Sequence, residues 1–177
     1  MRAMGRMVSP YEEVMLPRLM PLIIQIPDHE KVRFQAVMAL GRYTEWTSYH
    51  PDTLQPQLNF IMAAFNHPSK EVVRAAALSF KFFCIDCAGL LKDYVVQLQQ
   101  FYESVLMQLP TSSQEEITEG VAAVVAKQSL ENLYSTFKLY CDPVMKRLMD
   151  LAQNANDENG QLAVAGKNGT VSNFYLS

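Results

Sequence analysis

The middle of the chain alternates apolar and polar positions with the period of an α-helix. Between residues 67 and 110, apolar residues recur at steps of three and four, which places them on one helix face. They form two runs, and Ala88-Gly89 between them is a poor place to continue a helix. The first run is Val73, Ala77, Phe80, Cys84 and Cys87, and the second is Leu91, Val95, Leu98, Tyr102, Val105 and Leu109. Two such runs predict a helical hairpin.

The same pattern occurs before and after this hairpin. Shifted back by 41 residues, the hairpin aligns Arg74 with Arg33 and continues without a gap. Shifted forward by 44 residues, the match is weaker, and Arg74 aligns with Thr118. Helix pairs that recur every 40 to 47 residues or so are typical of HEAT and armadillo solenoids. We therefore predict an all-α fold, an α-solenoid of HEAT-like antiparallel helix pairs wound into an α-α superhelix.

The pattern divides the chain into three parts. Residues 1–9 have no period, and we expect them to be disordered. Residues 10–153 are predicted to hold the repeats, as three helix pairs after a leading helix that Ser9 caps and that kinks or splits at internal prolines. The polar residues 154–177 are predicted to be a disordered tail. Neither end has the polar capping repeat that a solenoid needs, so we expect a piece of a longer protein.

Turn and breaker residues predict the helix bounds. The first pair should open with one helix over residues 28–49, with Val32 among its inward positions. The second pair should end with one helix over residues 90–109. The third pair should begin with a capping box within residues 111–116, and its second helix should break or begin anew at Pro143.

Composition narrows the classes of function. Fifteen basic and eighteen acidic residues give a formal net charge of −3, which does not favour direct binding of nucleic acid. The apolar run at residues 22–26 is far shorter than the roughly 20 residues of a membrane helix, and we expect no membrane partner. No Gly-rich phosphate loop occurs among the seven glycines, so we expect no cofactor.

Cys84 and Cys87 form a CxxC pattern, which occurs in some metal and redox sites. A structural zinc site needs four ligands, and the third cysteine, Cys141, is 54 residues further along the chain. Both residues also fall on the apolar stripe, where a free cysteine packs as a small hydrophobe. The three histidines lie in turns without a matching nucleophile or carboxylate. We predict no catalytic residue, no metal site and no enzyme; chemistry at the CxxC is the weakest alternative.

Several packing motifs resemble those of one family. Residues 41–46, Gly-Arg-Tyr-Thr-Glu-Trp, and residues 50–61, His-Pro-Asp-Thr-Leu-Gln-Pro-Gln-Leu-Asn-Phe-Ile, are similar to mid-chain repeats of importin-β-type karyopherins. The similar branch is the transportin-SR / mRNA-transport-regulator branch. Residues 75–87 and 119–128 resemble its following repeats, so the resemblance covers about residues 12–156.

The resemblance implies a fragment of a nucleocytoplasmic transport receptor, present in nucleus and cytoplasm. Such a receptor binds cargo in the cytoplasm, passes the Phe-Gly repeats of nucleoporins and releases the cargo when Ran-GTP binds in the nucleus. In this branch the cargoes are Ser/Arg-rich RNA-binding proteins. The alternative is a HEAT-repeat scaffold for another complex, such as a phosphatase regulatory subunit.

One surface is a candidate for partner binding. On the second helix of the central pair, the apolar stripe should pack against its own hairpin, which leaves a polar face on the opposite side. That face consists of Gln97, Gln100, Glu103 and Ser104. In a HEAT superhelix we expect it to line the concave groove. Glutamines with one acid suit weak polar contacts with a basic cargo.

Overall fold

The computed structural model describes residues 9–154, and every regular element among them is helical, with no strand. These residues divide between Ser129 and Leu130 into two compact units. The all-α fold predicted from the sequence is confirmed for this part of the chain. None of the helices within residues 9–154 is long and apolar enough to cross a membrane.

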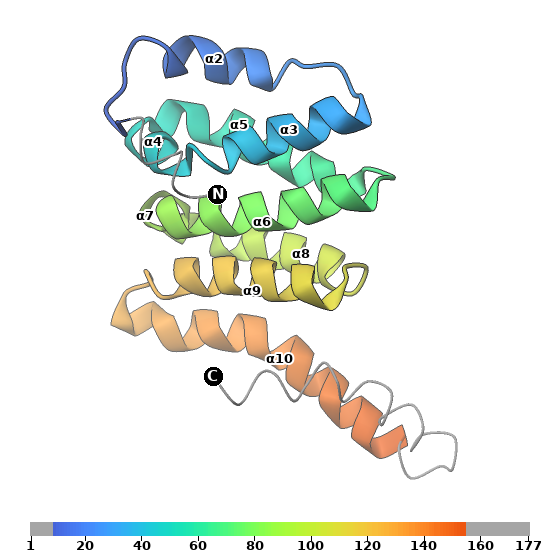
Figure 1. Cartoon of the computed structure of the whole chain (residues 1–177). Helices are drawn as coiled ribbons and strands as arrows, with labels where there is room; N and C mark the ends of the chain where they lie inside the picture. Colours follow the sequence, from blue (N-terminus) through green and yellow to red (C-terminus); the bar gives the residue numbers. More distant parts are fainter. Residues whose placement is uncertain (1–8, 155–177) are drawn as a thin grey trace. The chain divides into compact units, whose positions relative to one another are not determined.

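The first unit is a stack of helix pairs in two layers (Figure 1). The first-helix layer consists of α3 (Glu30–Leu40), α6 (Lys70–Asp86) and α9 (Thr111–Val125), side by side in that order. The second-helix layer lies behind it in this view and consists of α5 (Leu54–Ala63) and α8 (Val95–Leu106). Short elements join the layers: α4 (Thr44–Tyr49), η1 (Pro51–Thr53), η2 (Ala64–Asn66), α7 (Ala88–Leu91) and η3 (Lys92–Tyr94). Ahead of the stack, α2 (Leu16–Ile23) packs on α3.

The repeat is regular in the structure. The three helices of the first-helix layer begin at Glu30, Lys70 and Thr111, intervals of 40 and 41 residues. This spacing is that of HEAT-like pairs and confirms the solenoid predicted from the sequence. It also corrects the 44-residue offset of the third repeat, which was too long by about one helical turn.

The core of the stack lies around α6. This helix packs against α3 on one side and α9 on the other, with α5 and α8 behind it. Phe80, in the middle of α6, is 0% exposed. Its ring contacts those of Phe65 in η2 and Phe101 in α8 at centroid distances of 6.1 and 5.2 Å, so η2 and α8 both close over it.

The predicted helix over residues 28–49 is wrong, because the structure divides it into α3 and α4. After Leu40 the chain turns at Gly41, whose backbone lies against Ser79 of α6. The Thr44 hydroxyl then donates a hydrogen bond to Asp86 and holds the start of α4. Val32 is 40% exposed and does not point inward as predicted.

The predicted helix over residues 90–109 is also wrong. The chain forms α7, then the turn η3, and only then α8 from Val95. Within η3, the carbonyl of Lys92 accepts a hydrogen bond of 2.6 Å from Nε2 of Gln128, a residue 36 positions later. The Lys92 carbonyl thus bonds to a side chain far along the sequence, at the point where the helix is interrupted.

The leading helix begins at Leu16, not at Ser9. The Glu12 carboxylate accepts hydrogen bonds of 2.8, 2.7 and 2.6 Å from the backbone N–H groups of Val14, Met15 and Leu16, which makes it the cap of α2. Pro17 then lies in the first turn, where it needs no N–H partner, and Pro21 lies inside the helix.

Two expectations about the third pair are wrong. α9 begins directly after Pro110 with no side-chain cap, so the capping box is absent. α10 (Leu130–Asn154), the described part of the second unit, continues past Pro143, so the predicted break or new start at this residue is absent. The start and tail predicted to be disordered lie outside the described residues, except for Ser9 and Asn154.

Candidate partner-binding surface

The inner side of α8 is fixed by packing on α9. Leu98 and Tyr102, both predicted to point inward, are buried. The Tyr102 hydroxyl lies 3.0 Å from Oγ1 of Thr118, which itself donates to the carbonyl of Gln114 at 2.7 Å. The Thr118 oxygen therefore accepts from Tyr102, and this bond sets the rotation of α8 about its axis.

The four residues predicted to face away from the hairpin are all exposed in the structure: Gln97, Gln100, Glu103 and Ser104. The Ser104 hydroxyl donates to the carbonyl of Phe101 at 2.7 Å, so its proton is used within the helix. Within the described residues, the side chains of Gln97 and Gln100 make no hydrogen bond. Their exposure is as predicted, whereas their role in binding stays a prediction.

The same side of α8 holds apolar residues that the sequence interpretation left out. Val96 is 51% exposed and Met107 53% exposed. They lie on one helix face with Gln100 and Glu103, because positions 96, 100, 103 and 107 follow steps of three and four. Gln99, by contrast, is only 7% exposed, so one glutamine of the helix packs inward.

The exposed side of α5 also carries amide side chains, and the sequence interpretation missed them. Gln55 and Asn59 are exposed one turn apart, and Nε2 of Gln55 donates to Oδ1 of Asn59 at 2.9 Å. α5 has no charged residue at all, and α8 has only Glu103. The signal in the sequence was the amide-rich run at residues 55–59.

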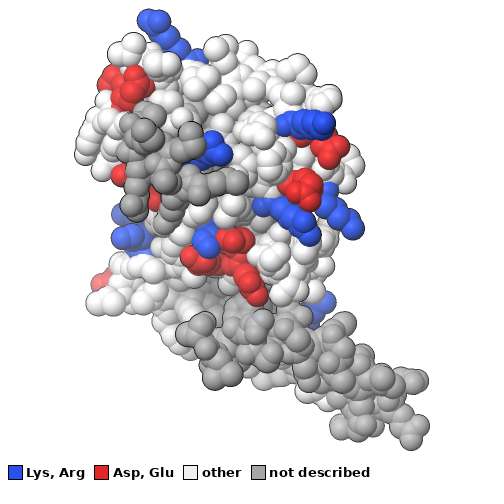
Figure 2. All heavy atoms as spheres, in the orientation of Figure 1, with Lys and Arg blue, Asp and Glu red and all other residues white. Residues whose placement is uncertain are grey.

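The first-helix layer has a different surface, with both signs of charge (Figure 2). Nζ of Lys81 on α6 lies 2.8 Å from a carboxylate oxygen of Glu116 and also pairs with Glu119, both on α9. Burial lowers the pKa of Lys81, but the hydrogen bonds and charges of the two carboxylates outweigh it, so the pKa is raised overall. Lys81 therefore stays charged and joins α6 to α9.

The CxxC cysteines are packing residues. Cys84 and Cys87 are buried, and Sγ of Cys87 donates to the carbonyl of Thr44 at 3.6 Å. Burial raises the pKa of Cys87 to about 12 and also raises that of Cys84, which keeps both thiols protonated. Within residues 9–154 no group of three His, Cys, Asp or Glu side chains could hold a metal ion.

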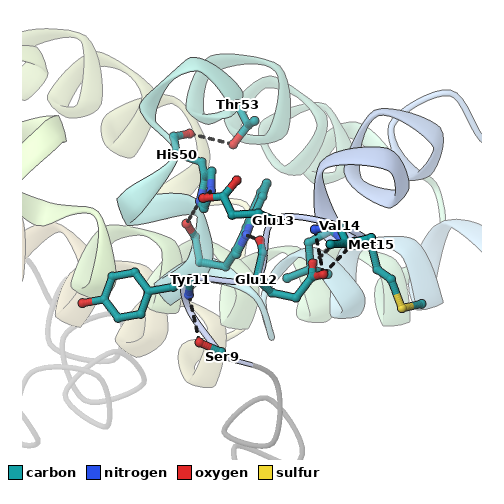
Figure 3. Close-up of polar contacts among 10 residues, drawn as sticks. Ser9, Tyr11, Glu12, Glu13, Val14, Met15, His50 and Thr53 are labelled. Carbon is teal, nitrogen blue, oxygen red and sulfur yellow. Dashed lines mark hydrogen bonds and ion pairs between the residues drawn. The ribbon is translucent and has the colours of Figure 1, made fainter.

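His50 has a structural role at the end of α4 (Figure 3). Its ring stacks on that of Trp46 at 3.9 Å, and its Nδ1 lies 2.7 Å from the Trp46 carbonyl. Its Nε2 lies 3.1 Å from Glu13, and Nε1 of Trp46 donates to the carbonyl of Glu12 at 2.7 Å. These contacts hold the segment before α2 against α4, and both polar atoms of the imidazole are used.

Residues 13–101 match the family described as the Transportin-3/Importin-13 third TPR domain. Over its whole length the chain is 34% identical to an uncharacterized protein of Schizosaccharomyces pombe, of which it covers 18%. It is 31% identical to the mRNA transport regulator MTR10 of Saccharomyces cerevisiae, over 84% of the chain and 16% of that protein. It is 23% identical to human importin-13, over 92% of the chain and 16% of importin-13.

A solved structure of importin-13 in its cytosolic state has the same fold. It aligns with 85% of this chain at a TM-score of 0.67 and 20% identity. The aligned part is 18% of that chain. The protein thus spans less than a fifth of the length of these relatives, and its helix pairs match one stretch of a longer solenoid.

Proposed function

The chain belongs to the Transportin-3/Importin-13 third TPR domain family, and from this premise we propose that it is a segment of a nucleocytoplasmic transport receptor of the karyopherin class. The observation that carries the proposal is the family match over residues 13–101. The stack of helix pairs at HEAT spacing supports it, because such a stack binds partners over a long surface instead of a pocket. The family match favours this function over that of a scaffold for an unrelated complex.

The proposal extends to the branch and its cargo. The identity to the mRNA transport regulator MTR10 and the motifs at residues 41–46 and 50–61 support the transportin-SR / mRNA-transport-regulator branch. The cargo is then a Ser/Arg-rich RNA-binding protein. The whole receptor carries it between cytoplasm and nucleus, contacts nucleoporin Phe-Gly repeats and releases the cargo on binding Ran-GTP.

Within this segment, the proposed cargo contact is the polar side of α8. Its side chains are exposed and project from a helix whose inner side is fixed on α9. Glu103 is the only charged group of α8, and it can pair with one arginine of a basic cargo. An exposed pair of this kind adds little affinity, so Glu103 acts by steering and selection and not as the main anchor.

The test is a pull-down of a Ser/Arg-rich RNA-binding protein by the 177-residue chain. Glu103→Lys combined with Gln100→Lys places two positive charges on α8, and we expect retention to fall about tenfold at low salt. The loss should shrink at high salt, where screening weakens repulsion between exposed charges. The matched control is Glu115→Lys, the same charge reversal at an exposed position of α9.

Circular dichroism of each variant checks that the helices are intact. Retention that is equal for the wild type and the α8 variant at low salt would exclude α8 as the cargo contact. A wild-type chain that retains no Ser/Arg-rich protein at any salt concentration would contradict the cargo class.

A further inference from the structure

Residues 11–13, which we call the strap, lie against α4 (Figure 3). The carbonyl of Glu12 accepts a hydrogen bond of 2.7 Å from Nε1 of Trp46, which is only 2% exposed. Oε1 of Glu13 lies 3.1 Å from Nε2 of His50, the residue directly after α4. The strap is therefore held on α4 by one backbone carbonyl and one carboxylate.

His50 contacts two groups that can only accept hydrogen bonds. Its Nδ1 lies 2.7 Å from the Trp46 carbonyl, while its own backbone N–H bonds to the carbonyl of Thr47. Its Nε2 faces the Glu13 carboxylate. A neutral imidazole carries a single N–H, so it would turn a lone pair towards one of these two oxygens. Only the doubly protonated ring donates to both.

His67 shows the other case. Its Nδ1 accepts a hydrogen bond of 3.0 Å from the backbone N–H of Ser69, and its Nε2 lies 3.8 Å from a carboxylate oxygen of Asp28. One partner is a donor and the other an acceptor, so a neutral ring suits both. Of these two histidines, only His50 has contacts that require the charged ring.

The charges near His50 have one sign. The charged side chains of the strap, α4, η1 and the last turn of α6, which contacts α4, are all acidic: Glu12, Glu13, Glu45, Asp52 and Asp86. Lys81, earlier in α6, pairs with carboxylates of α9. No positive side chain of these segments therefore opposes a second proton on the imidazole.

Histidine is the side chain that ordinarily changes its charge between about pH 5 and pH 8. We propose that His50 is a pH-sensitive latch, whose doubly protonated ring holds the strap on α4 and whose neutral ring loosens it. The strap is then held at low pH and loosened as the pH rises. Loosening uncovers Trp46 and weakens the start of α2, which Glu12 caps. The latch belongs to the helix stack itself and does not depend on the proposed transport function.

Hydrogen exchange at the amides of residues 14–16 measures the latch, because these amides bond to Glu12 beside it. The comparison uses protection factors, which remove the intrinsic effect of pH on exchange. We expect protection to be about fivefold lower at about pH 8 than at about pH 5.5, the effect of losing one hydrogen bond. Trp46 is the single tryptophan of the chain, so its fluorescence should shift to longer wavelength over the same range as water reaches the indole.

Glu13→Gln is the decisive variant. An amide can accept from the charged ring and donate to the neutral ring, so protection should no longer depend on pH. His50→Gln removes the titrating group and should also abolish the dependence. The matched control is Glu45→Gln, which removes an exposed carboxylate of α4 and should keep the pH dependence of the wild type. Circular dichroism checks that each variant is folded, and Glu13 is exposed, so its replacement leaves the core intact.

Three results would overturn the inference. One is a wild-type protection factor that is equal at the two pH values. Another is a Glu13→Gln variant that keeps the full pH dependence of the wild type. The third is a His50 ring that carries one proton instead of two at about pH 5.5, as nitrogen NMR of the imidazole would show. None of them bears on cargo binding, which the pull-down tests separately.

Discussion

At the scale of single residues, two glycines decide how closely the helices of the first-helix layer approach. A Cβ atom on Gly41 would lie 2.8 Å from Cβ of Ser79, and one on Gly120 would lie 2.9 Å from Cα of Lys81. Ser79 uses the proximity to donate a hydrogen bond of 2.9 Å to the carbonyl of Val37 on α3. The spacing of α3, α6 and α9 therefore depends on side chains that are small or absent.

Gly120→Ala should destabilise the protein even though alanine is the better helix former. The new methyl group would meet the Lys81 backbone, which cannot move without shifting α6 against α9, and we expect a loss of about 1 to 3 kcal/mol. The control is Gly89→Ala in α7, where the new Cβ would meet nothing within 4 Å beyond its chain neighbours and the backbone of its own helix. That variant should gain roughly 0.5 to 1 kcal/mol from lower backbone entropy of the unfolded chain.

Urea unfolding followed by circular dichroism measures both changes. An unchanged unfolding midpoint for Gly120→Ala would mean that α6 and α9 separate without cost, and the close approach would then not stabilise the stack.

At the scale of elements, the buried stripes could be predicted from the sequence, but the places where helices stop could not. The spacing of Leu98 and Tyr102 reveals their buried side because helical period alone determines it. The interruptions after Leu40 and at Lys92 depend on contacts with Ser79 and Gln128, far away along the chain. No local pattern contains that information.

The candidate surface shows the same division. The exposure of Gln97, Gln100 and Glu103 followed from the amphipathic pattern of one helix. The exposed amides of α5 were missed because the amide-rich run at residues 55–59 does not itself separate Gln55 and Asn59 from Gln57, which is buried. The prediction at Pro143 fails in the opposite way. The proline is a strong local signal for the end of a helix, but α10 continues past it.

The start of α2 provides a prediction at this scale. Hydrogen bonds from the backbone N–H groups of Leu16, Met15 and Val14 hold the pKa of Glu12 below its ordinary value. The electrostatic interaction with His50 is a minor cause in the same direction. A lowered folded-state pKa means that the contribution of Glu12 is complete above the ordinary carboxyl pKa of about 4.3 and is lost as pH falls through the lowered value.

Glu12→Gln keeps the size of the side chain but leaves one acceptor oxygen for three N–H groups. Hydrogen exchange at about pH 7, well above the carboxyl pKa, should therefore speed up at the amides of residues 14–16, while exchange in α6 stays the same. Glu45→Gln, at an exposed position of α4, is the control and should leave the same amides unchanged. Equal exchange in wild type and Glu12→Gln would show that the carboxylate is not the cap of this helix.

At the scale of the first unit, neighbours support one another along the stack. α6 contacts α3 and α9, whereas α2 packs mainly on α3. In a solenoid, stability is approximately a sum of repeat and nearest-neighbour terms, so a helix with two neighbours is held more strongly than one with a single neighbour. Local opening should therefore be easiest at α2 and hardest at α6.

Two core substitutions of similar burial test this gradient, Phe80→Ala in α6 and Met20→Ala in α2. Phe80 is 0% exposed and Met20 1% exposed, so burial alone predicts comparable losses. Because Phe80 also holds Phe65 and Phe101, its replacement should cost about 3 to 5 kcal/mol and lower the protection of every helix in residues 9–129. Met20→Ala should instead release α2 and leave hydrogen exchange in α6 and α9 close to that of the wild type. If Met20→Ala lowered protection throughout the unit as Phe80→Ala does, the unit would unfold as one cooperative block, and the nearest-neighbour description would be wrong for it.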